Sequence, residues 1–208
     1  RGTATSENFS DEPKQMLFAE LEELLENTER LKALLKVWVS LTSAPNGEIQ
    51  TALDSLIEEF KNAPKESSWE TIYDEIEPTI DLFVQEWQKT SQVQSEDLPK
   101  DPAILKQNFT SILRASLIAV TDKQVKVLPQ ESENQSDPES YQKDLLYRQL
   151  MAVREHPENP IKYFAKAVKL DPNYAIAYSS WGKHLVDAEM IHASQKKFEK
   201  LTQLEPDN

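Results

Sequence analysis

The chain has 208 residues, with 23 Lys and Arg against 36 Asp and Glu, a net charge of −13, and no Cys. This composition excludes disulfides and thiolate metal sites, and no stretch approaches the roughly 20 apolar residues that a membrane-spanning helix needs. Only 3 Gly are present, so long helices joined at Pro-marked breaks are favoured over hairpin turns. The sequence therefore predicts an all-α protein, and we expect it in the cytoplasm by default.

The charge is uneven along the chain. Residues 1–100 carry 9 Lys and Arg against 21 Asp and Glu, while residues 101–208 carry 14 against 15. Binding to nucleic acid or to anionic lipid depends on clustered Lys and Arg, so we expect no nucleic-acid partner and no membrane insertion. We interpret the acidic half as a solvated surface, with a docking face for a basic partner as the alternative.

The first part of the chain predicts a disordered leader, residues 1–9, and an acidic helical bundle, residues 10–128. From Ser10 or Asp11 we expect one long amphipathic helix, because its apolar residues keep a 4-3-4-3 spacing as far as Thr42. A dimeric coiled coil is the alternative interpretation of this pattern.

Three further helices are expected in the bundle. The first spans residues 48–62, and the second carries Pro78, which removes a backbone donor and predicts a kink or a break near Glu77. The third is capped by Asp101-Pro102. Its sequence is unusually apolar, so we expect it at the centre of the bundle.

Residues 129–137 have no apolar side chain after the initial Pro, so they predict a flexible linker at a module boundary. Asp137-Pro138 is expected to start a helix, and residues 138–208 are expected to form helical repeats. Setting Pro172 and Pro206 as equivalent gives a period of 34 residues. The matching phrases around them are Leu170-Asp171-Pro172-Asn173 and Leu204-Glu205-Pro206-Asp207.

Residues 175–208 resemble one complete tetratricopeptide repeat, and residues 141–174 resemble a degenerate one that matches only in its second helix. The positions that carry the resemblance are Tyr178, Gly182, Ser194, Phe198 and Pro206. The sequence departs from the family at Glu189-Met190, which replaces the common Gly-containing turn, and at Leu201, which replaces Ala. The resemblance covers only the last third of the chain, and it implies antiparallel helical hairpins that stack as an α-α superhelix after the bundle.

The resemblance also implies a partner-binding groove lined by the first helix of each unit. The inward-facing positions are Ile176, Ser179, Lys183 and Val186. We therefore expect a non-catalytic scaffold or adaptor whose partner is another protein or peptide. Because the chain begins at Arg1 and ends on the phrase that closes a repeat, we expect a fragment of a longer protein. A self-associating structural bundle, or the regulatory arm of an enzyme whose catalytic domain lies elsewhere, remain as alternatives.

No residue pattern indicates chemistry, so we expect no enzyme activity, no cofactor and no metal site. His156, His184 and His192 are scattered and are expected on the surface. Asn108 belongs to a glycosylation pattern, which we discount because the residue lies inside an apolar helix. The four Trp lie on apolar stripes, and we expect them in the core.

Overall fold

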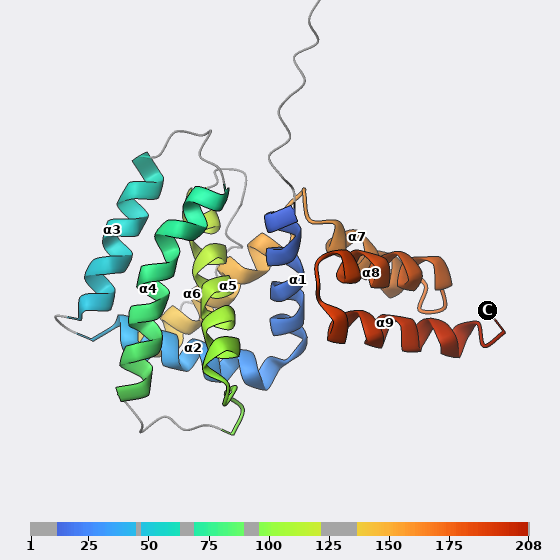
Figure 1. Cartoon of the computed structure of the whole chain (residues 1–208), viewed down its shortest axis with the longest axis horizontal. Coiled ribbons are helices and arrows are strands. Elements are labelled where there is room, and N and C mark those ends of the chain that lie inside the picture. Colours follow the sequence, from blue (N-terminus) through green and yellow to red (C-terminus); the bar gives the residue numbers. More distant parts are fainter. Residues whose placement is uncertain (1–11, 45–46, 63–68, 90–95, 122–136, 208) are drawn as a thin grey trace, which may run out of the picture.

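The fold is all-α (Figure 1). The computed structural model describes residues 12–44, 47–62, 69–89, 96–121 and 137–207, and within these ranges it contains helices and no strand. The expected leader and nearly all of the expected linker lie outside them. The helices are α1 (Glu12–Glu26), α2 (Thr28–Thr42), α3 (Glu48–Asn62), α4 (Trp69–Lys89), α5 (Pro102–Thr121), α6 (Pro138–Arg154), α7 (Pro160–Leu170), α8 (Ala175–Asp187) and α9 (Ile191–Leu204).

The first six helices form a bundle with α5 at its centre. This helix packs against α1, α2, α3, α4 and α6, and its side chains Leu105, Phe109 and Ile112 are fully buried. The ring of Phe83 lies 4.6 Å from the ring of Trp38 and 4.6 Å from the ring of Phe109, measured between centroids. The central position expected for this apolar helix is confirmed, because burial of apolar surface is the main favourable contribution to folding.

The prediction of one long N-terminal helix is wrong, because α1 and α2 are separate helices that meet at Asn27. Asn27 has φ −99° and ψ 81°, and its side-chain oxygen accepts a hydrogen bond of 3.2 Å from the backbone N–H of Arg30. Asn is a favoured N-cap because it satisfies a donor at the helix start. The two helices run in different directions (Figure 1), so the continuous apolar spacing serves two helices and no coiled coil.

A break near Glu77 is not observed, because α4 continues on both sides of Pro78. Pro78 is exposed, whereas Ile76 and Ile80 are fully buried. A Pro inside a helix costs about 3 kcal/mol, and burying one large aliphatic side chain contributes roughly 1.5–3 kcal/mol. Two or more such side chains on the buried face therefore outweigh the lost backbone hydrogen bond.

The expected helix starts at Asp101 and Asp137 are confirmed. The Asp101 carboxylate accepts a hydrogen bond of 2.9 Å from the N–H of Ala103, and the Asp137 carboxylate accepts one of 3.1 Å from the N–H of Glu139. In both helices a Pro occupies the first position, where its missing N–H costs nothing. Local chemistry was sufficient to place these two starts.

The structure places α6 differently from the sequence analysis, which put it with the repeats of residues 138–208. This helix packs against α5, α2 and α1, and it buries Leu150 and Val153 in the same core as the preceding helices. Consecutive helices α6 and α7 make few contacts with each other, so residues 141–174 do not form a paired hairpin. Packing therefore joins α6 to the bundle, and one continuous hydrophobic core extends from the bundle through α7 to α9.

Helices α8 and α9 form the hairpin that the sequence predicts, and α7 packs beside α8. The ring of Phe198 on α9 lies directly against Gly182 on α8. A Cβ atom at Gly182 would lie 2.7 Å from Cε1 and 2.8 Å from Cζ of that ring. The turn between the helices contains Glu189 at φ 61°, a left-handed conformation that Gly normally occupies.

We expect Gly182→Ala to lower the free energy of unfolding by about 1 kcal/mol, because an overpacking cost of roughly 1–3 kcal/mol exceeds the gain of roughly 1 kcal/mol from Ala in a helix. In a Phe198→Ala background the obstruction is gone, and the same change should stabilise by about 0.5–1 kcal/mol. Urea unfolding of the four proteins measures both effects. A stabilising effect in both backgrounds would contradict the close contact.

Besides the stripe that packs into the bundle core, α1 carries a second stripe of four residues, which joins the bundle to the C-terminal helices. Its four residues recur every fourth position, so they share one side of the helix. Each contacts the chain after residue 153: Lys14 with Glu158 at 2.6 Å, Phe18 with His156 at 6.0 Å between rings, Glu22 with Arg154 at 3.1 Å, and Glu26 with Lys197 at 3.0 Å. His156 is buried in this contact, so the expectation that it lies on the surface is wrong.

The Glu22–Arg154 pair is the buried member of this joint. Glu22 is only 5 % exposed, Arg154 Nη2 donates to its Oε1 at 3.1 Å, and Arg154 Nε lies 3.1 Å from Oε2. Burial raises the pKa of the Glu22 carboxyl, and Arg154 opposes that shift only in part. Glu22 therefore holds a proton more tightly in the folded state than in the unfolded state.

This raised pKa predicts a pH dependence with a definite sign. Between the ordinary value of 4.5 and the higher folded value, the folded state binds more protons, so the contribution of Glu22 to stability falls as the pH rises. We expect Glu22→Gln to remove that fall. Free energies of unfolding measured from pH 4 to pH 8 should favour the variant increasingly at higher pH, and parallel curves for the two proteins would refute the assignment.

Candidate partner-binding surfaces

The four residues expected to line a groove lie along one side of α8. They recur at spacings of 3, 4 and 3 residues, which places them on the same face of a helix. Ile176 is 65 % exposed and Val186 is 42 % exposed, Lys183 is exposed, and Ser179 is half-buried. We call these four residues the α8 face. Other side chains of α8 pack on α7 and α9, so the α8 face is left for solvent or for a partner.

Further large apolar side chains are exposed next to this helix. Leu170 ends α7, Tyr174 precedes α8, and both are exposed. Tyr163 on α7 is exposed as well, although its hydroxyl donates a hydrogen bond of 3.3 Å to the carbonyl of Pro157. Single exposed apolar residues are common on soluble proteins, but groups of them mark interaction surfaces.

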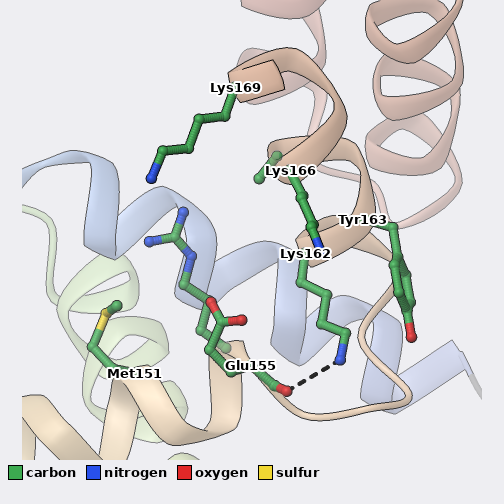
Figure 2. A pocket seen from close by; sticks show the side chains of 8 residues that line it. Met151, Glu155, Lys162, Tyr163, Lys166 and Lys169 are labelled. Carbon is green, nitrogen blue, oxygen red and sulfur yellow. Dashed lines mark hydrogen bonds between the residues drawn. The ribbon is translucent and has the colours of Figure 1, made fainter. Parts of the chain in front are cut away.

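A basic groove lies between the end of α6 and α7, and sequence reasoning missed it (Figure 2). Its volume is about 510 Å³. Lys162, Lys166 and Lys169 recur at spacings of 4 and 3 residues, so they project from one side of α7. The signal in the sequence was a helix with three Lys and no acidic residue, but the opposite wall, with Met151 and Glu155, comes from a different helix.

Two cations of the basic groove already have structural roles. Arg154 pairs with Glu22, and Lys162 donates a hydrogen bond of 3.3 Å to the carbonyl oxygen of Glu155, drawn as a dashed line in Figure 2. Lys166 and Lys169 have no carboxylate partner among the residues that the structure describes. The groove can therefore hold one small anionic group, such as a carboxylate.

His184 on α8 has a partly buried side chain. Burial lowers the pKa of His184, which favours the neutral imidazole, and Asp187 opposes this shift. The ring of His184 lies 6.1 Å from the ring of Phe164, so it packs against α7. Across the described ranges no three His, Cys, Asp or Glu side chains are grouped so that they could hold a metal ion.

Two of the four Trp are buried as the sequence predicts. Trp38 lies in the bundle core and Trp181 in the hairpin. Trp87 is half-buried against the bundle core, and the side chain of Trp69 is outside the described part. Lys197 Nζ lies 3.7 Å from the ring centroid of Trp181, a cation–π contact that adds to the packing of α9.

No protein-family model matches the chain. Comparison with curated proteins gave no match, and comparison with solved structures gave none. In the described part of the chain, no helix combines the length and the apolar character required to cross a bilayer.

Proposed function

We propose that the chain is a non-catalytic adaptor that holds another protein or peptide against the α8 face. The observation that carries the proposal is the exposure of Ile176 and Val186 on a helix that buries Ala177, Trp181 and Leu185. A bound partner would remove this apolar surface from water, with a gain of roughly 25 cal/mol for each Å². The resemblance of residues 175–208 to a tetratricopeptide repeat supports the same helix as the binding element.

Lys183 gives the α8 face a polar anchor between its two exposed apolar residues. It has no carboxylate partner among the described residues, so its ammonium group is available to an acceptor on the partner. A contact surface with an apolar centre and a few placed polar groups is typical of protein interfaces. The expected ligand is a peptide with an apolar side chain flanked by a carboxylate.

The self-associating bundle is less well supported than the adaptor. Helices α1 to α5 bury their apolar stripes inside the chain, and Leu17, Leu34, Ile80 and Leu105 are fully buried. Such a bundle does not need a second copy to complete its core.

The proposal predicts that Val186→Asp weakens peptide binding about tenfold, the effect of losing one well-buried contact. Peptides would be selected from a displayed library on the immobilised chain, and their affinities measured by fluorescence anisotropy. Lys183→Glu should weaken the binding of the same peptides, because it places a negative charge against their carboxylate.

Val120→Asp provides the matched control, since Val120 on α5 has a similar exposure, 40 %. This control should leave the affinities unchanged, and light scattering would check that none of the variants alters the assembly state. Equal losses for Val120→Asp and Val186→Asp, or a library that yields no peptide sensitive to Val186→Asp, would reject the α8 face as the binding surface.

A further inference from the structure

A second pocket lies where α1, α5 and the α8–α9 turn meet. It has a volume of about 420 Å³, and three carboxylates contribute to its lining. We call it the acidic pocket. Its principal lining residues are Glu20, Glu23, Ile104, Asn108, Glu189 and Ile191.

Asn108 is a buried polar residue in the otherwise apolar helix α5, and it lines the acidic pocket. It is only 9 % exposed, and its amide nitrogen has no hydrogen-bond partner in the described part of the chain. An unpaired buried donor destabilises a fold. Because the side chain also lines the acidic pocket, its amide can hydrogen-bond to a molecule held there.

The carboxylates of the acidic pocket are only partly compensated. Glu20 is held in place, because Gln107 Nε2 donates to it at 3.0 Å and the Ser111 hydroxyl donates to its other oxygen. Glu23 and Glu189 have no ion-pair partner among the described residues. Arg30 is the one Lys or Arg among the lining residues, so the pocket retains a net negative charge.

Apolar side chains flank these charges. Ile104 and Ile191 both line the acidic pocket and are exposed. A ligand that suits the pocket therefore combines a cationic head with an alkyl stem. An Arg side chain has both features, and its planar guanidinium donates to carboxylate and amide oxygens in fixed directions while being weakly hydrated.

We propose that the acidic pocket binds an arginine side chain from a basic segment of a partner polypeptide. The guanidinium would meet Glu23 and Glu189, the alkyl stem would lie against Ile104 and Ile191, and Asn108 would hydrogen-bond to the same segment. The net charge of −13 attracts a basic segment at long range and accelerates its association. This inference goes beyond the proposed function, because it concerns a different surface and a different chemistry of partner.

The basic groove beside α7 is the weaker candidate for a second site. Two of its four cations are already used within the chain, by Glu22 and by the carbonyl of Glu155. The overall negative charge also opposes the approach of an anionic partner. In the acidic pocket, the local charge, the net charge of the chain and the unpaired buried amide all favour a cationic ligand that can form hydrogen bonds.

The test uses the full chain and a fluorescein-labelled octapeptide of alternating Arg and Ser, with affinity measured by anisotropy. Replacing its Arg by citrulline, which keeps the shape without the charge, should abolish binding. Glu23→Gln with Glu189→Gln should weaken binding about tenfold, from the loss of two ion pairs. The control pair Glu48→Gln with Glu58→Gln removes the same charge from exposed positions on α3 and should change the affinity less than about twofold.

Two single variants should change the affinity for the Arg peptide in opposite directions. Arg30→Gln removes a positive charge that repels the Arg peptide from the acidic pocket, so we expect binding about two- to threefold tighter. Asn108→Leu removes the unpaired amide, so we expect the melting temperature to rise by about 3 °C while the affinity for the peptide falls severalfold. A purely structural Asn would show the opposite change in melting temperature.

The inference is overturned if the citrulline peptide binds as well as the Arg peptide. Equal losses for the two pairs of Glu variants, or unchanged binding by Asn108→Leu, would overturn it as well. Val186→Asp should bind the Arg peptide normally. If Val186→Asp leaves the affinity for the library peptides unchanged while the Arg peptide binds as expected, the α8 face is rejected and the acidic pocket is not.

Discussion

Helix α1 is the element on which the rest of the structure depends, because it is buried on two sides at once. Its stripe Leu17, Leu21 and Leu24 is buried in the bundle core. Its second stripe, from Lys14 to Glu26, faces the C-terminal helices through ion pairs and a ring contact. A helix that buries two faces in different partners fixes their relative position, since neither contact can slide without exposing the other.

The two stripes differ in chemistry, and this difference has a structural consequence. The first is apolar and non-directional, so it supplies most of the stabilisation. The second contains Glu22, which pairs with Arg154 in a buried site, and buried ion pairs contribute more to specific placement than to stability. The placement also brings Glu189 of the α8–α9 turn and Asn108 of α5 into the lining of one pocket, the acidic pocket.

Sequence periodicity predicted most helices correctly, but it predicted only some of their ends. The hairpin of α8 and α9 and the helix starts at Asp101 and Asp137 could be predicted from the sequence, because spacing and capping are local properties. The break at Asn27 was missed, since the apolar spacing runs through it without interruption. Burial of the α4 face overrode the effect expected of Pro78, an outcome that depends on neighbours absent from any local pattern.

By itself the sequence determined that this protein is all-α, acidic and free of Cys, that its last 34 residues pair as a helical hairpin, and that the α8 face carries Ile176 and Val186. Only the tertiary structure decided that α6 belongs to the bundle, that α1 is a joint between two groups of helices, and that a basic groove and an acidic pocket exist. The reason is physical: spacing along a helix specifies which side chains share a face, but the partner of each face is chosen by packing among helices far apart in the chain.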